Sequence, residues 1–586
     1  MVAPALAFAG GVAVGAAVAA NALRRRLARR RPRRVLVGLE VAASQSWRIL
    51  RGSNGDAKNA NDKNKTKTRV AVFTNHTGVC PRTGRHVVDM LHACVSVDLR
   101  AVFAPEHGFR GEKQAGFSSG GAATDAVTGV AVVDAYRSRG DPAALAAMLY
   151  EADVDCVVFD VQDVGARFYT YVSSLYDLLV AVARLNNDET SETKDKKRRR
   201  ARVVVLDRPN PLGGTTTEGP VVVEAGFDSF VSRVSVPIRH GMTVGELALL
   251  FNRRFVGADP DNPSGKKLAK TDLRVAPMRR WRRGMAWEDT KLPWVPPSPN
   301  VPSPTSALAY VGTCLLEATN ACEGRGTTTP FELVGAPWAD ARLAREMNRR
   351  GALSTRKDTS SSFLLREIKN KDASFAAAAS SPLRRGALRR RRLTAPSVDA
   401  RTRRPASACV WREAHFTPSW GKEKDVPCVG AAAMFSFSSS EDGDGADFLS
   451  RVAYVKRALF LEGVEVLLAL KKLYPRAFQW REVSRNGVFF ETNSSRPDTR
   501  SLSRVERAAA RARVLASPTK VSRNKKKTTS NTPPFIDLLT GSAGLRLAMD
   551  GAPDPDSRRV AVEREREKWD KQLVAFEKSR RDALLY

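Results

Sequence analysis

The 586-residue sequence lacks the short motifs that mark several common enzyme classes. No G-x-G-x-x-G follows the first apolar run, which argues against dinucleotide binding. No G-x-S-x-G nucleophile elbow occurs, and no H-x-x-x-H or comparable spacing of metal ligands is present. We therefore expect a protein that works without a metal ion and without a cofactor.

Cysteine is scarce and irregularly spaced. The chain has seven cysteines, an odd number, and no C-x-x-C pair. Several lie in apolar runs, as Cys156 does in "DCVVFD". This pattern predicts free, buried thiols and makes a disulfide scaffold improbable.

Acidic residues are too few to balance the basic ones. The 96 Lys and Arg residues outnumber the 62 Asp and Glu residues, which gives a formal net charge of +34. Such an excess is typical of proteins that bind nucleic acid or anionic surfaces. However, much of it lies in short runs within apparent polar insertions, where charge usually stays solvated. No zinc-finger spacing or aromatic–basic RNA-binding motif occurs, so we expect no specific nucleic-acid partner.

The first 23 residues carry no charge and precede an arginine cluster. A signal peptide, a signal anchor and an organellar transit peptide all fit this pattern. The stretch is long enough to span a bilayer, but it consists mostly of Ala, Gly and Val and is weakly hydrophobic. The expected localisation is therefore membrane-anchored, secretory or organellar, and the sequence does not choose among the three.

Composition divides the chain into four segments. We predict a targeting or anchor segment (1–34), a disordered linker (35–68), a Rossmann-like domain (69–255) and a second subdomain (256–586). Two basic, disordered insertions are expected within the last segment, near 354–404 and 494–531.

Strand and helix patterns alternate in the third segment. Apolar runs predict strands at 69–74, 97–103, 129–136, 154–160 and 201–207. Helical spacing is present at 84–95, 141–152, 170–185 and 243–255. This alternation predicts an α/β fold built on a doubly wound parallel sheet.

Polar turns follow four of these strands. They are "TNHTG" (74–78), "APEHGFRGE" (104–112), "DVQDVGARFYTY" (160–171) and "LDRPNPLGG" (206–214). The carboxyl ends of parallel strands meet at one edge of the sheet, where open α/β sheets bind ligands. Asp160, Asp163 and Asp207 can be explained as turn formers or helix caps. A turn requires neither Glu106 nor His107, so these two are the stronger functional candidates.

Three later stretches have a similar character. They are "PIRHGMTVGELA" (237–248), "WVPPSPNVP" (294–302) and "EGRGTTTPFE" (323–332). In the first, Thr243 and Glu246 have the spacing of a capping box, which alone can account for Glu246. The carboxylates, tyrosines, asparagines and arginines of the whole set suit a polyhydroxylated or anionic ligand. Glu106 at a strand end is a reasonable acid for glycoside hydrolysis.

Taken together, these motifs resemble the exo-β-N-acetylmuramidase (NamZ-like) family, formerly a domain of unknown function. The resemblance includes "VFDVQDVGARFYTYVSSL" and "EGRGTTTPFELVGAPW", with all seven motifs in the same order. It covers most of 69–353 and patches of 405–586.

The resemblance implies a Rossmann-like domain joined to an α+β subdomain, with the active site in the cleft between them. It implies release of N-acetylmuramic acid from the non-reducing end of peptidoglycan fragments, with Glu106 as the catalytic glutamate assisted by Tyr169 or Tyr171. The residues that would line the cleft to bind a muramyl saccharide are Asn75, His107, Arg110, Gln162, Asp163, Arg208, Asn210, His240, Asn300, Glu323 and Arg325.

One departure from the family pattern supports an alternative. The family continues toward Ala-Gly-Glu after "GE", whereas this sequence has "AGF" at 115–117. The loss of an acidic contact motivates the hypothesis of a non-catalytic protein that binds muramyl saccharides without cleaving them. The sequence predicts no oligomeric state.

Overall fold

The computed structural model describes ten parts of the chain, and for 351–357 only the backbone. The described residues are 34–51, 67–111, 113–114, 116, 123–187, 200–258, 267–357, 409–435, 458–482 and 533–586. Residues 1–33 and most of both predicted basic insertions lie outside them. The proposed targeting segment and the localisation therefore stay predictions. None of the described helices combines the length and the apolar character needed to cross a membrane.

A seven-stranded sheet forms the core of the first domain. Its strand order is β3-β4-β2-β1-β5-β6-β7, and only the β3–β4 pair is antiparallel. The strands are β1 (Thr68–Thr74), β2 (Val97–Ala104), β3 (Ala123–Thr124), β4 (Ala131–Asp134), β5 (Cys156–Asp160), β6 (Arg202–Leu206) and β7 (Asp272–Ala276). The predicted doubly wound α/β fold is confirmed.

The order of the strands reverses at β1. The chain passes from β1 to β2 on one side and later returns to β5 on the other. The carboxyl ends of β1 and β5 are paired through Thr74 and Asp160. A reversal of this kind opens a crevice beyond the strand ends, which is the usual ligand site of such sheets.

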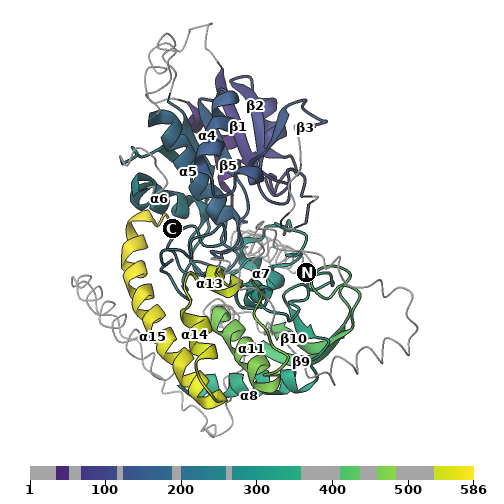
Figure 1. Cartoon of the computed structure of the whole chain (residues 1–586). Helices are drawn as coiled ribbons and strands as arrows, with labels where there is room; N and C mark the ends of the chain where they lie inside the picture. The colour runs from purple at the N-terminus through teal and green to yellow at the C-terminus, as the bar shows by residue number, and fades with distance from the viewer. Residues whose placement is uncertain are drawn as a thin grey trace, which may run out of the picture.

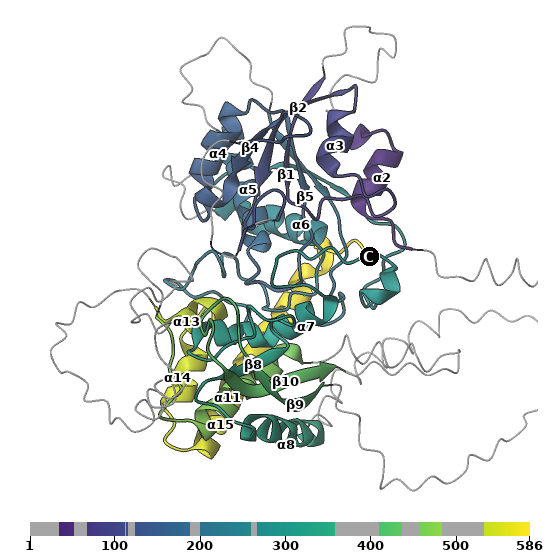
Figure 2. The same ribbon diagram turned by 90° about the vertical axis from the view of Figure 1, so that its right-hand side faces the viewer.

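Helices cover both faces of the sheet (Figure 2). One face packs against α4 (Pro142–Glu151), α5 (Tyr171–Asn187) and α6 (Val244–Arg254). The other packs against α2 (Gly38–Ser44) and α3 (Val87–His92). Alternate residues of each strand pack against the helices on opposite faces of the sheet. The strands are therefore buried on both sides, as their continuous apolar runs predicted.

Residues 34–51 belong to this second layer, although the sequence predicted a linker over 35–68. Val35 and Leu39 are fully buried beside the sheet. Gly38 approaches the backbone so closely that a Cβ there would lie 2.3 Å from the Asp207 nitrogen. The sequence did not predict this short apolar segment because the long polar run at 52–68 follows it directly. The sheet also extends past the predicted boundary at 255, because the half-buried edge strand β7 contains Arg274 and lacks a continuous apolar run.

The second subdomain has a three-stranded antiparallel sheet in the order β8-β10-β9. Its strands are β8 (Leu333–Ala336), β9 (Cys409–Phe416) and β10 (Cys428–Phe435). The helices are α7 (Pro304–Thr313), α8 (Arg342–Lys357), α11 (Leu459–Leu473), α13 (Phe535–Thr540), α14 (Gly544–Asp550) and α15 (Pro555–Arg580). Helices α7 and α11 touch through glycines, since a Cβ on Gly463 would lie 2.1 Å from the Gly312 oxygen.

The end of the chain returns to the first domain. Figure 1 shows α15 running the length of the second subdomain and ending beside α6. The Tyr586 hydroxyl then donates to Asp207 Oδ2 at 2.7 Å, and the Leu585 amide donates to Glu246 Oε1 at 2.8 Å. One hydrophobic cluster includes residues of β5, α11 and α13, so both domains share a core.

Candidate active site

Glu106 lies in the turn after β2, with 6% of its surface exposed. Its Oε1 accepts a hydrogen bond from the Gly116 amide at 2.7 Å, and its Oε2 accepts one from the Thr170 hydroxyl at 2.5 Å. The next residue, His107, has a φ of +73°, and its Nδ1 lies 3.0 Å from the Lys113 oxygen. One donor from the same loop and one from a distant segment therefore hold the carboxylate in one orientation.

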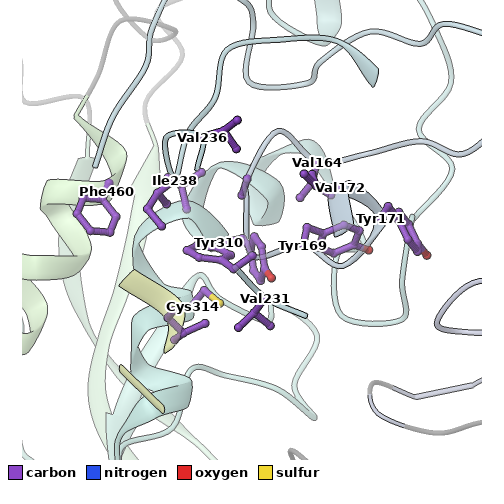
Figure 3. Packing of buried hydrophobic residues seen from close by; sticks show 14 of the residues in the cluster. Val164, Tyr169, Tyr171, Val172, Val231, Val236, Ile238, Tyr310, Cys314 and Phe460 are labelled. Atoms are coloured by element: carbon purple, nitrogen blue, oxygen red, sulfur yellow. The ribbon is translucent and has the colours of Figure 1, made fainter. Parts of the chain in front are cut away.

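Two tyrosines lie close to Glu106: Tyr171 is the first residue of α5, and Tyr169 precedes the helix by two residues. The Tyr171 hydroxyl accepts from Asn75 Nδ2 at 2.7 Å and donates to the Pro297 oxygen at 2.8 Å. The rings of Tyr169 and Tyr171 meet edge to face at 4.9 Å, and Tyr310 packs on Tyr169 at 5.7 Å (Figure 3). Burial raises the pKa of both Tyr169 and Tyr171. Their hydroxyls are therefore neutral and able to donate hydrogen bonds.

A cavity of about 50 Å³ lies between the two domains at this point. The segments before α7 contribute Glu106, His107, Phe168, Tyr169, Thr170, Val231, Ser298 and Val301, and α7 with the segments after it contributes Tyr310, Glu317, Arg325, Phe331 and Phe535. Burial also lowers the pKa of His107, so its imidazole is neutral here. The volume suits a few water molecules rather than a whole sugar ring.

Arg325 brings a buried ion-pair network to the cavity wall. It contacts Glu317 at 2.6 Å and Glu323 at 3.4 Å, and Lys422 contacts Glu323 at 2.7 Å. The two acids and two bases form a chain of matched charges. Two residues of this network were predicted site residues. Arg325 lines the cavity, whereas Glu323 does not line it and forms ion pairs with Arg325 and Lys422.

Four other predicted residues are buried around the carboxyl ends of the strands and do not line the cavity. His240 Nε2 lies 3.3 Å from Asp163 Oδ2, which also accepts from the Gly165 amide at 2.7 Å. The side-chain amide of Gln162 donates to two backbone oxygens, and the side-chain amide of Asn210 donates to one. These contacts fix loops against one another, and direct contact of these four side chains with a substrate stays a prediction.

The remaining predicted residues also have protein partners. Arg208 forms a two-point ion pair with Asp160 at 2.6 and 3.0 Å. Arg110 pairs with Asp125 at 2.5 Å and leaves 44% of its side chain exposed, outside the cavity. Asn300 donates to Gln114 Oε1 at 3.0 Å and lines a second, larger groove described below.

Several site residues were not predicted. Thr170 stands between the two predicted tyrosines, so its position in "RFYTY" offered a signal. Tyr136 lies close enough to Glu106 for the carboxylate to raise its pKa, after the larger effect of burial. Tyr310 and Glu317 come from α7 and the turn that follows it, and no polar motif marks them in the sequence.

All seven cysteines are free thiols, as predicted, and six are buried. Within the described ranges, no group of three or more His, Cys, Asp or Glu residues is arranged to hold a metal ion.

The doubly wound domain and the α+β subdomain enclose the Glu106 carboxyl group at their junction. This architecture is suited to acid-assisted chemistry. The chain belongs to the exo-β-N-acetylmuramidase NamZ family. The model of the family's N-terminal domain matches residues 70–305, and the model of its C-terminal domain matches 308–375 and 391–586.

Two relatives illustrate the relationship. The peptidoglycan beta-N-acetylmuramidase NamZ of Bacillus subtilis is 41% identical over 270 residues, which are 46% of this chain and 57% of that protein. The match thus spans little more than half of the relative's length. A DUF1343 family protein from Bacteroides fragilis has the same fold, with a TM-score of 0.58 and 24% identity, covering 95% of this chain and all of the other.

Proposed function

We propose that this protein is an exo-acting glycosidase that releases N-acetylmuramic acid from the non-reducing end of peptidoglycan fragments. Family membership and the name of the Bacillus relative support the reaction class. The observation that carries the proposal is the position of Glu106, whose oriented carboxyl group lines a small cavity together with Tyr169 and Arg325.

In this reaction Glu106 acts as the general acid. Gly116 can only donate to Oε1, so that oxygen remains an acceptor in both protonation states. The Thr170 hydroxyl can either donate to Oε2 or accept from it, because a hydroxyl has both capacities. Oε2 is therefore the oxygen that carries the proton delivered to the leaving sugar.

We propose that the second catalytic group is not a carboxylate of the protein. Asp160 is paired with Arg208 and Asp163 with His240, and neither lines the cavity. Glu317 lines it but is paired with Arg325. We infer that the substrate's own N-acetyl oxygen attacks the anomeric carbon, as in other substrate-assisted glycosidases. This route retains anomeric configuration, so the α-anomer as the first product by NMR would overturn it.

The central test replaces Glu106 by Gln, which keeps the shape and removes the acidic proton. We expect turnover of the MurNAc–GlcNAc disaccharide to fall by about two to four orders of magnitude, the usual scale for acid–base catalysis. Glu563→Gln is the matched control, because Glu563 leaves 58% of its side chain exposed on α15, away from the cavity. Near-normal turnover by folded Glu106→Gln protein would exclude Glu106.

The alternative is a muramyl-saccharide-binding protein that does not cleave its ligand. Ala115 and Phe117, whose identities motivated it, lie outside the described residues, whereas Gly116 holds Glu106. Saturable binding of the disaccharide by purified protein, without release of N-acetylmuramic acid, would favour this alternative.

A further inference from the structure

A second, open groove of about 770 Å³ begins beside the cavity. Its lining comprises Gln114, Pro299, Asn300, Gly326 to Thr329, Leu333, Arg412, Ala414 to Thr417, Ser419 and Trp420. Its size lies within the usual range for binding sites of organic ligands.

The groove and the cavity share their walls. Ser298 and Val301 line the cavity, while Pro299 and Asn300, between them, line the groove. Arg325 lines the cavity and the next residue, Gly326, lines the groove. Gln114 also reaches the groove, two residues before the Gly116 amide that holds Glu106. Segments that line the cavity therefore continue directly into the wall of the groove.

One face of the β8-β10-β9 sheet forms part of the groove. Helix α8 packs against β9 and β10, where Trp411 is buried, and it lies below the sheet in Figure 2. On the opposite face, Arg412 and Ala414 line the groove. Val410 and Met434 pair across the two strands and remain 41% and 42% exposed. Among the described residues, this face is apolar at Val410 and Met434 and presents the guanidinium group of Arg412 to the groove.

An aromatic ring lies beside the cavity wall. The Arg325 guanidinium is 6.0 Å from the centre of the Trp420 ring. Ser419 donates to the Gly326 oxygen at 2.8 Å, and a Cβ on Gly326 would lie 2.3 Å from the Trp420 nitrogen. The packing of these two loops fixes the backbone at Trp420, which lines the groove together with the threonines at 327–329. Sugars bind well to such a combination, because their C–H faces pack on aromatic rings and their hydroxyls need polar partners.

We propose that this groove binds the leaving part of the glycan, with Arg412 recognising the carboxylate of the second sugar beyond the scissile bond. This inference rests on the proposed function. In an alternating glycan, the cleaved muramyl residue is followed by a neutral GlcNAc and then by a second muramyl residue with its lactyl carboxylate. GlcNAc occupies the groove near Trp420, and the second muramyl residue extends over β9.

Charge supports this occupant. Arg412 donates to the Glu413 backbone oxygen at 3.2 Å, and no carboxylate among the described residues pairs with its guanidinium. Arginine binds carboxylates through two parallel hydrogen bonds, which makes it selective for such a group. The open groove also fits an exo-acting enzyme, in which the chain beyond the terminal sugar stays outside the closed end of the site.

The test compares two trisaccharides that differ only in the third sugar, MurNAc–GlcNAc–MurNAc and MurNAc–GlcNAc–GlcNAc. We expect kcat/KM to be about tenfold higher for the first, the scale of one charge-assisted contact at an exposed site. Arg412→Gln should reduce this ratio to about one. Arg564→Gln, the same change on exposed α15, should leave the ratio at its wild-type value.

The outcomes separate the two proposals. Equal kcat/KM for both trisaccharides in active wild-type protein would overturn the role of Arg412 and leave the glycosidase proposal intact. Cleavage of neither trisaccharide nor the disaccharide would overturn the proposed function itself. Binding of both trisaccharides to Glu106→Gln protein by calorimetry gives a second readout, and the preference for the charged sugar should be lost in Glu106→Gln/Arg412→Gln. Persistence of that preference would also overturn the proposal.

Discussion

At the scale of single residues, the site depends on how the Glu106 carboxylate is held. Its two oxygens have different partners, a backbone amide and a hydroxyl, and only the hydroxyl adapts to a change in protonation. Under the proposed function, Thr170 therefore influences the step in which Glu106 gives up its proton. Glycoside hydrolysis needs the acid to face the leaving oxygen, so orientation matters as much as acidity.

Replacing Thr170 by Val keeps the shape of the side chain and removes this hydrogen bond. We expect kcat to fall by about tenfold to a hundredfold, since a hydrogen bond to a charged group is worth about 1.5–3 kcal/mol. KM should change much less. Thr170→Ser, which keeps the hydroxyl, should restore most of the activity. Equal kcat for the Val and Ser variants in steady-state kinetics would refute the assigned role.

At the scale of elements, the start of α6 depends on a buried acid. Asp207 accepts from the Gly245 amide at 2.8 Å, the Thr243 hydroxyl at 2.9 Å and the Tyr586 hydroxyl at 2.7 Å. Burial raises the pKa of Asp207 to about 7, although these donors oppose the shift. The contact therefore joins the last residue of the chain to the N-terminus of a helix in the first domain.

The raised pKa of Asp207 predicts that the free energy of unfolding falls as pH rises. The folded protein retains a proton that the unfolded chain loses near pH 4, so ionisation destabilises the fold as pH rises from about 4 to 7. We expect the free energy of unfolding of wild type, relative to Asp207→Asn, to fall by a few kcal/mol over this window and then level off. Denaturant unfolding at several pH values measures it. Asp228→Asn, 62% exposed, controls for surface charge. A difference that does not vary with pH would show that Asp207 is ionised throughout.

At the scale of the whole molecule, the sequence predicts the sheet better than the site. Continuous apolar runs give β1, β2, β5 and β6 because both faces are covered, and the polar turns after them mark the ligand-binding edge. The meeting of Glu106 with Tyr169 and Arg325 was expected from the resemblance to a family.

The contribution of Trp420 was not predictable. Its loop lies more than 300 residues from Glu106 in sequence, and no periodic pattern connects them. Similarly, the sequence did not predict that Gln162 and Asn210, which stay candidates for substrate binding, donate hydrogen bonds to the backbone of neighbouring loops. Polar residues at the ends of strands can bind ligands or hold loops together, and the sequence alone does not show which contacts they make.

Arg167 limits how the molecule can open. Its side chain is fully buried and donates to the oxygens of Pro220, Val221 and Val236, and across the domain boundary to Leu539 of α13 at 3.1 Å. A hinge movement of the two lobes would strip a carbonyl from a buried cation, which is costly. If the proposed function is correct, a sugar ring would therefore have to enter this small space through local rearrangement of loops, without separation of the two lobes.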